Sequence, residues 1–305
     1  MKQAASLILC KPNGTGLFDV LMVKRSAKGT FKSIYAFPGG AVDECDSNPA
    51  YSTANTLPLS NFRVAALREA FEECGVTHKH IITTHPPLAN KSNVSSTISL
   101  PEWQSRVRAD AKAYVDFTES LAIPLPLPSL VHWAHWITSA IEKRRFDTHF
   151  FLAALDTAAP SFTVAPDNTE ITETEWISPK DAISAFKDGR IRLIPPQFTT
   201  MMELQRYTFE DVCNLVKGET TRRVPYSCQP EPYLCNVDGK VLLLPGDVKH
   251  TAIAEMEKSG FMDGIQKGAK NRLKFGWTEG VVTSIEIIAT GGHNAMGALD
   301  LSSKL

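Results

Sequence analysis

The sequence of 305 residues lacks any apolar run that approaches the ~20 residues needed to cross a bilayer. Its apolar opening, Ala4 to Cys10, is too short for the core of a secretory signal. No charge of one sign dominates, since 32 basic residues stand against 33 acidic ones. General nucleic-acid binding needs a basic surface that neutralises phosphates and is therefore disfavoured, whereas a small phosphorylated substrate needs only a local cluster of cations. We expect a soluble intracellular protein without a membrane span.

The six cysteines also lack a pairing pattern. There is no Cys-x-x-Cys pair and no neighbouring histidine at the spacing of a zinc site, so free thiols in a reduced compartment are expected. The composition, with 43% hydrophobic and 21% charged residues, is ordinary for a globular protein that buries one large core or two modest ones.

An acidic segment is the most informative feature that is present. It runs from Arg68 to Val76 and lies downstream of Phe37-Pro38-Gly39-Gly40. On a helix, Glu69, Glu72 and Glu73 project from one face, where their like charges repel and call for a cation such as Mg²⁺ or Mn²⁺. A bare Glu-rich helix is more often a solvated face. The glycine pair before it, Arg68, and Gly75 as a helix C-cap favour a metal site here.

This segment resembles the second half of the Nudix box, which it matches from Arg68 to Val76. The first half departs from the family pattern. Asp46 stands where the family has Glu, and 21 residues from 47 to 67 replace the usual seven. We interpret residues 47–61, rich in Ser, Asn, Thr and Pro, as an inserted surface loop that rejoins the catalytic helix at about Asn61.

The resemblance implies an α/β (α+β) fold, a Nudix α/β/α sandwich with a mixed sheet over residues 1–195. A helical and irregular C-terminal extension is expected over 196–302. Hydrophobic periodicity and turn residues predict the individual elements. These are a hairpin of Ala4–Cys10 and Phe18–Lys24, strands at 131–137, 146–155, 239–244 and 281–289, and helices at 101–121, 181–187 and 199–217.

Nudix enzymes cleave a diphosphate linked to a nucleoside, and divalent metals neutralise the oxygens and orient the attacking water. The resemblance implies that Glu69, Glu72 and Glu73 are metal ligands, and that Glu69 or an acid outside the box is the base. Candidates for the outside acid are Glu170, Glu173 and Glu175, which otherwise are surface charges. Arg68 is expected to orient carboxylates by ion pairing. Gly39 and Gly40 suit a tight turn that approaches the metal or phosphate closely.

The segment Leu21–Ser26, followed by Phe31 and the Gly39-Gly40 turn, is similar to that of peroxisomal coenzyme A diphosphatases, one branch of which carries a box insertion. The resemblance covers residues 4 to 200 and includes Arg145-Phe146-Asp147-Thr148 and Glu175-Trp176. It implies hydrolysis of coenzyme A and acyl-CoA to adenosine 3′,5′-bisphosphate and (acyl-)4′-phosphopantetheine. Arg25, at the matching place in the motif, is the candidate for the 3′-phosphate of the substrate.

Two alternatives stay open. In the first, the chain hydrolyses another nucleoside diphosphate derivative such as NADH, ADP-ribose or a nucleotide sugar, although the run that marks NADH diphosphatases is absent after Val76. In the second, the chain is a non-catalytic nucleotide-binding module, although its retention of all three acids argues against this.

Other conspicuous residues receive simpler interpretations. Large aromatic residues are usually core, and the histidines alternate along expected strands as in ordinary packing. The residues concerned are Trp133, Trp136, Trp176, His132, His135 and His149. The ending Ser303-Lys304-Leu305 matches the signal read by the peroxisomal import receptor, which predicts that receptor as a partner and the peroxisome matrix as the location.

Overall fold

The computed structural model describes residues 1–26, 33–51, 57–83, 98–140, 142–156, 163–220, 227–236, 239–245, 247, 249–252, 270–278 and 281–289. Phe31 and the terminal tripeptide 303–305, both singled out from the sequence, lie outside these residues.

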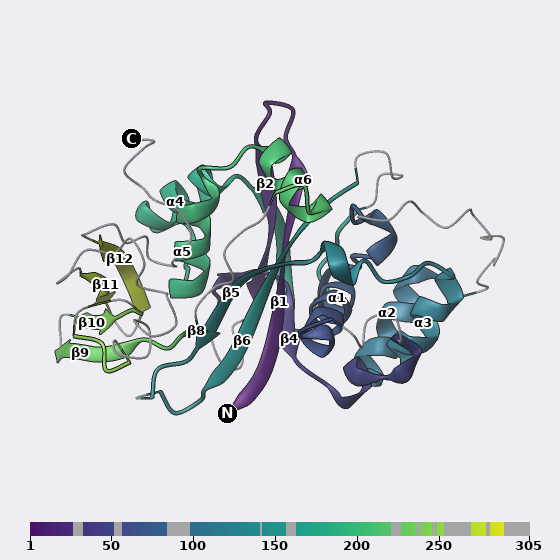
Figure 1. Ribbon diagram of the computed structural model, residues 1–305, viewed down its shortest axis with the longest axis horizontal. Helices are drawn as coiled ribbons and strands as arrows, with labels where there is room; N and C mark the ends of the chain where they lie inside the picture. Colours follow the sequence, from purple (N-terminus) through teal and green to yellow (C-terminus); the bar gives the residue numbers. More distant parts are fainter. Residues whose placement is uncertain are drawn as a thin grey trace.

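A mixed sheet of eight strands forms the centre of the protein (Figure 1). Its order is β3-β2-β1-β6-β5-β8, with β4 also paired to β1 and β7 to β2. The pairs β1–β6 and β5–β8 are parallel and the other pairs are antiparallel. The strands are β1 (Lys2–Pro12), β2 (Phe18–Arg25), β3 (Tyr35–Ala36), β4 (Gly39–Ala41), β5 (Val131–Ile137), β6 (Phe146–Ala154), β7 (Ile171–Ile177) and β8 (Ser227–Cys228).

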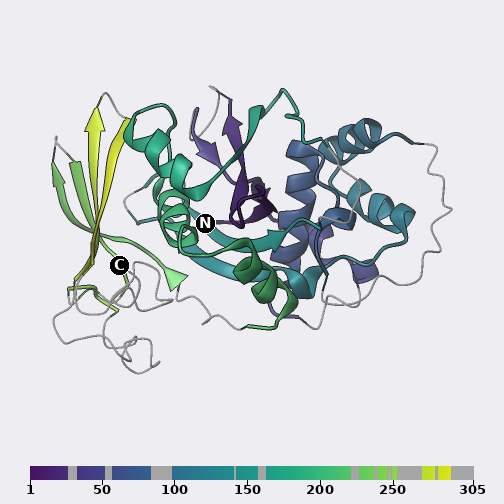
Figure 2. The same cartoon turned by 90° about the horizontal axis from the view of Figure 1, so that it is seen from above.

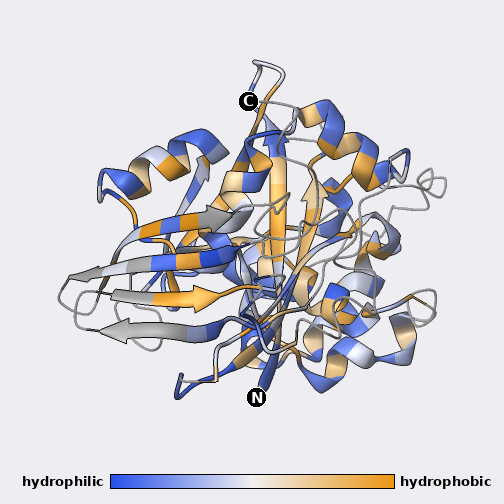
Figure 3. Cartoon of the chain, turned by 60° about the vertical axis from the view of Figure 1, so that its left-hand side comes forward, coloured by the Kyte–Doolittle hydropathy of each residue, from blue (hydrophilic) through white to orange (hydrophobic). Residues whose placement is uncertain are grey.

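Helices cover both faces of this sheet (Figures 1 and 2). One layer contains α1 (Ser60–Cys74), α2 (Leu100–Ala109) and α3 (Ala113–Leu121), and the other contains α4 (Pro179–Lys187), α5 (Pro195–Leu204) and α6 (Phe209–Lys217). Strand β1 supplies both cores, because Leu7 and Leu9 pack toward α1 while Ile8 and Cys10 pack toward α4 to α6. The apolar colour of the central strands in Figure 3 reflects this double burial. The predicted α/β/α sandwich and the hairpin of β1 and β2 are confirmed.

Two helices predicted as single are each divided in two. The segment 101–121 breaks between α2 and α3, where Asp110 ends α2 and its side chain accepts a hydrogen bond from the N–H of Lys112 at 3.0 Å. The segment 199–217 breaks between α5 and α6, where Thr208 starts a new helix through a capping box with Asp211. In both places a side chain satisfies backbone groups locally and competes with continuous helix.

The C-terminal region forms a second sheet of order β12-β11-β10-β9, of which only the two strands near 239–244 and 281–289 were predicted. Leu242, Leu273 and Ile285 join the same hydrophobic cluster as Phe198 and Leu204 of α5. The predicted boundary at 195/196 falls within α5, so the core continues across it. The strands are β9 (Glu231–Asn236), β10 (Gly239–Leu243), β11 (Asn271–Thr278) and β12 (Val281–Ala289).

The described part of the insertion is more than a surface loop. It continues from a 3-10 turn at Glu44–Ser47 into a second one at Pro49–Tyr51, and Tyr51 is buried in the core on the α1 side. The expectation of a purely surface excursion was therefore wrong for this residue, because an aromatic ring gains by packing against the helices. The rejoining point near Asn61 is confirmed, since α1 begins at Ser60.

Several smaller expectations can be settled. Trp133 and Trp136 are buried in the core as predicted, while Trp176 is partly buried with the ammonium of Lys11 over its ring. Cys10, Cys45, Cys74, Cys213 and Cys228 are free, and the side chain of Cys235 lies outside the described residues. None of the helices in the described ranges combines the length and apolar character that a bilayer crossing requires.

Candidate active site

Helix α1 carries the acidic segment, and its other side anchors it to the sheet. Ala65, Ala66, Ala70 and Phe71 are completely buried in the core on this side. Gly75 ends the helix in the left-handed conformation, with φ of 74°, and its N–H donates to the carbonyl of Phe71 at 2.8 Å. The acids are therefore held on a rigid element.

Arg68 organises the carboxylates around it through all five of its N–H groups. Nε and Nη2 donate to the two oxygens of Asp46 at 2.8 and 3.0 Å, and Nη2 also donates to the carbonyl of Ala41 at 2.8 Å. Nη1 donates to Glu69 at 3.0 Å and to Glu72 at 2.6 Å. Only 3% of the Arg68 side chain is exposed, so it cannot present a free donor to a substrate. The guanidinium instead fixes three carboxylates relative to strand β4 at Ala41.

The glycine pair lies directly against the carboxylates of Glu73 and Glu69. The N–H of Gly39 donates to Glu73 Oε2 at 2.9 Å. A side chain at Gly40 would collide with the carboxylate of Glu69, and one at Gly39 would collide with the carbonyl of Ala5. The two glycines lie in strand β4 and not in the tight turn expected from the sequence, and close approach of the backbone explains why glycine stands at both positions.

Arg25 lies at the edge of this acidic group rather than apart from it. Its Nη1 is 3.6 Å from Glu73 Oε1, and its Nη2 is 3.4 Å from Glu170 Oε2. Of the three candidates for an outside acid, Glu170 is the one whose charge acts on Glu72 and Glu73. Glu173 is instead paired with Lys24 at 2.7 Å.

The electrostatics of the site favour a divalent cation. Burial raises the pKa of Glu69 to about 7, and the neighbouring charge of Glu72 adds to the effect against the opposing influence of Arg68. Burial also raises the pKa of Glu72, and it raises that of Glu73 well above its ordinary value. Buried carboxylates that are not fully compensated cost free energy, which a bound cation would offset. Oxygen ligands of this kind fit Mg²⁺ or Mn²⁺.

Asp46 was not among the site residues expected from the sequence, although its side chain is fully buried against Arg68. The available signal was its position, where the family pattern has Glu. The 3-10 turn that holds it is built locally. In its capping box the side chain of Asp43 accepts a hydrogen bond from the N–H of Cys45, and the side chain of Asp46 accepts one from the N–H of Asp43. A shorter acid thus reaches Arg68 from the start of the insertion.

The structure also brings together residues that were interpreted as ordinary packing. His135, Asp147 and His149 meet on β5 and β6, with their nearest ligand atoms all within 4.8 Å of one another. The alternation along each strand was visible in the sequence. The pairing register that puts the two strands side by side was not.

Comparisons with known proteins agree with this geometry. The family model described as the NUDT19 Nudix domain matches residues 52–206. The acyl-coenzyme A diphosphatase NUDT19 of Gallus gallus is 28% identical, over 81% of this chain and 79% of its own length. The Homo sapiens protein of the same name is 31% identical, over 77% of this chain and 61% of its own.

Among solved structures, a Nudix hydrolase from Alicyclobacillus acidocaldarius superimposes with a TM-score of 0.57. It is 20% identical, over 70% of this chain and 96% of its own, and therefore supports the fold alone. The match of the family model over half of the sequence, with the 31% identity to the Homo sapiens protein, establishes that the chain belongs to the Nudix family and carries a Nudix domain of the NUDT19 type.

Proposed function

We propose that this Nudix protein hydrolyses the diphosphate bond of coenzyme A and acyl-CoA, giving adenosine 3′,5′-bisphosphate and (acyl-)4′-phosphopantetheine. The observation that carries the proposal is the group of carboxylates held by Arg68 and by the Gly39 N–H against strand β4. The names of the relatives, acyl-coenzyme A diphosphatases, supply the substrate class.

In this proposal Glu69, Glu72 and Glu73 hold Mg²⁺ or Mn²⁺. The bound ion would neutralise diphosphate oxygens and make water a better nucleophile. Arg68 positions Glu69 and Glu72 through its hydrogen bonds, and the Gly39 N–H keeps Glu73 in place. Glu170, exposed at the edge of the acids, accepts the proton of the attacking water.

The role of Arg25 is a separate proposal with two forms. As first expected, Arg25 binds the 3′-phosphate of coenzyme A. Its contacts with Glu73 and Glu170 support the second form, in which it compensates the charge of the acids. Arg25→Ala distinguishes the two. A larger rise in KM for coenzyme A than for its 3′-dephospho analogue supports phosphate binding. An equal rise for both substrates removes Arg25 from that site.

The substrate is tested by incubating the full chain with Mg²⁺ or Mn²⁺ and separating the products by chromatography. The panel contains coenzyme A, an acyl-CoA, NADH, ADP-ribose and a nucleotide sugar. We expect the highest kcat/KM with coenzyme A or acyl-CoA. Faster cleavage of any other member would overturn the substrate assignment, and tight coenzyme A binding without product would favour the non-catalytic module.

We further propose that Ser303-Lys304-Leu305 is bound by the peroxisomal import receptor and directs the chain to the peroxisome. The tripeptide acts as such a signal when it ends the chain, so a fluorescent protein fused to the N-terminus keeps it available. Deletion of the three residues should leave that fusion in the cytosol. A fusion that reaches peroxisomes equally well without them would contradict this proposal.

A further inference from the structure

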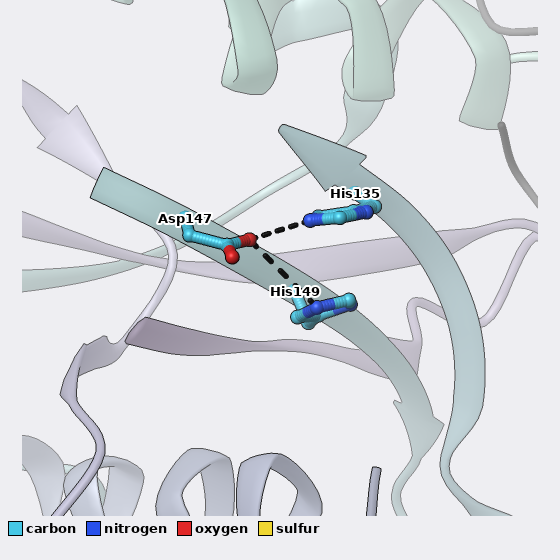
Figure 4. Close-up of side chains that lie close together, drawn as sticks. All are labelled: His135, Asp147 and His149. Atoms are coloured by element: carbon cyan, nitrogen blue, oxygen red, sulfur yellow. Dashed lines mark hydrogen bonds and ion pairs between the residues drawn. The ribbon is translucent and has the colours of Figure 1, made fainter. Parts of the chain in front are cut away.

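His135, Asp147 and His149 form a second group of potential metal ligands, separate from the acids of α1; Figure 4 shows the three side chains. His135 Nε2 is 2.5 Å from Asp147 Oδ1, and His149 Nε2 is 3.9 Å from the same oxygen. His135 comes from β5, and Asp147 and His149 come from β6. The cluster formed by these three residues is named the histidine cluster below.

Strand register explains why the three side chains meet. His135 lies directly opposite His149 in the antiparallel pair of β5 and β6. Asp147 is two residues before His149 and therefore shares its face of the sheet. Both strands are central and hydrogen-bonded on each side, so the backbone positions of the ligands are rigid. A preformed backbone of this kind favours metal binding because little order has to be gained.

A fourth residue supports the cluster from behind. His149 Nδ1 is 3.0 Å from His132 Nε2, and the edge of the Phe62 ring of α1 packs against the His149 ring. A hydrogen bond at one ring nitrogen orients the imidazole and leaves the other nitrogen for a metal. Since the Nδ1 atom of His149 faces His132, its Nε2 atom is the one directed at Asp147.

From this geometry we propose that His135, Asp147 and His149 form a second metal site, which binds a borderline divalent transition metal such as Zn²⁺. Two imidazoles and one carboxylate suit zinc far better than Mg²⁺, which prefers oxygen ligands. The side chains of His135 and Asp147 are 18% and 21% exposed, so solvent can reach the site and supply a further ligand. The metal would join β5 to β6 and stabilise the sheet beside the start of α1.

This site is distinct from the carboxylates. Ala5 of β1 pairs with His149 on one side and with Gly40 on the other. Two strand spacings therefore separate His149 from Gly40, a distance of about 10 Å. One ion cannot contact both groups.

Metal binding requires a small rearrangement. The rings of His135 and His149 are stacked with their centroids 3.9 Å apart and their planes within 14°. An ion in the plane of both rings needs them to tilt, and it replaces the proton between His135 Nε2 and Asp147. Ligand atoms bound to zinc at 2.0–2.2 Å lie about 3.4 Å from one another. The corresponding atoms of the three residues already lie within 4.8 Å of one another.

The test is titration of the full chain with Zn²⁺ in the presence of excess Mg²⁺, followed by calorimetry and by thermal unfolding. We expect one tightly bound Zn²⁺ and a raised unfolding temperature, because an ion that binds only the folded state stabilises it. His135→Gln and Asp147→Asn should each weaken Zn²⁺ binding at least about tenfold, and His132→Gln should weaken it less.

Glu72→Gln is the matched control, since it removes a carboxylate of α1 and should leave Zn²⁺ binding unchanged. Absence of Zn²⁺ binding by the unaltered chain would overturn the proposal without the use of any variant. Zn²⁺ binding that persists in both His135→Gln and Asp147→Asn would also overturn the proposal. So would Zn²⁺ binding that is lost in Glu72→Gln. The readouts are binding and unfolding, so the outcome does not depend on whether the chain hydrolyses coenzyme A.

Discussion

The acids of α1 and the histidine cluster lie on the same face of the sheet, on opposite sides of β1, yet they are assembled differently. Glu69, Glu72 and Glu73 come from five consecutive residues of one helix. His135 and His149 come from two strands that a turn separates, and they meet only through register.

The electrostatic character of the two groups also differs. The carboxylates repel one another. The guanidinium of Arg68 uses all its donors to hold Glu69 and Glu72 together with Asp46, and the Gly39 N–H holds Glu73. In the histidine cluster His135 is hydrogen-bonded to the carboxylate of Asp147, and His149 is hydrogen-bonded to His132. A local sequence pattern thus reveals a site with unbalanced charge, whereas a balanced cluster stays hidden until the strands are placed.

The largest expected effect is on the acidic group when Arg68 is removed. Arg68→Ala leaves Asp46 buried without its partner and should lower the free energy of unfolding by about 3–5 kcal/mol. Urea denaturation of the metal-free protein measures it. His135→Gln is the matching change in the histidine cluster and should cost less, because His135 is partly exposed. Similar losses of unfolding free energy in Arg68→Ala and His135→Gln would contradict the expected difference between the two groups.

Activity should separate the two groups as well. Glu72→Gln removes one proposed metal ligand and should lower metal-dependent turnover about 100-fold, at the upper end of losses seen when metal-site partners are changed. Glu102→Gln, an exposed glutamate on α2, serves as the control and should leave turnover unchanged. Turnover within a few-fold of the parent in Glu72→Gln would exclude Glu72 as a ligand. His135→Gln should retain activity.

The outside acids give a narrower test. Glu170→Gln should slow the chemical step by at least about 100-fold, as expected for loss of a positioned base. Glu173, which is paired with Lys24 and hydrogen-bonded to Tyr35, should tolerate the same change with little loss of kcat. Single-turnover kinetics separate the chemical step from binding. Equal effects in both variants would leave the proposed base without support.

The last comparison is a pH dependence of opposite sign in the two groups. Burial raises the pKa of Glu69 from 4.5 to about 7, so the folded metal-free protein binds an extra proton and loses stability as pH rises between these values. Burial, with the charge of His135, lowers the pKa of His149 from 6.5 to about 3, so stability is lost as pH falls between them. Each group contributes a slope of up to about 1.4 kcal/mol per pH unit.

Urea denaturation across this pH range, in the presence of a chelator, measures both slopes. Glu69→Gln should remove the loss of stability toward neutral pH, and His149→Gln should remove the loss toward acid. A stability profile that neither variant changes would show that the two groups do not titrate as described. Added Mg²⁺ should stabilise the protein more at higher pH, because the ion competes with the proton on Glu69.

Much of the fold followed from local signals. The hairpin of β1 and β2 was marked by apolar runs around an Asn-Gly turn, and β5 by its alternation. Helix α1 and its C-cap at Gly75 followed from the acidic segment. The breaks at Asp110 and Thr208 were missed, because short capping interactions decided them within segments of helical periodicity.

By itself, the sequence determined the helix that carries Glu69, Glu72 and Glu73, since spacing along one helix fixes which side chains are neighbours. It could also indicate that these charges need compensation. Only the tertiary structure decided that Arg68 would donate two hydrogen bonds to Asp46, which lies 22 residues before it. It also decided that His135 would face His149. Both contacts depend on chain segments brought together by the packing of the sheet and α1, which no local pattern specifies.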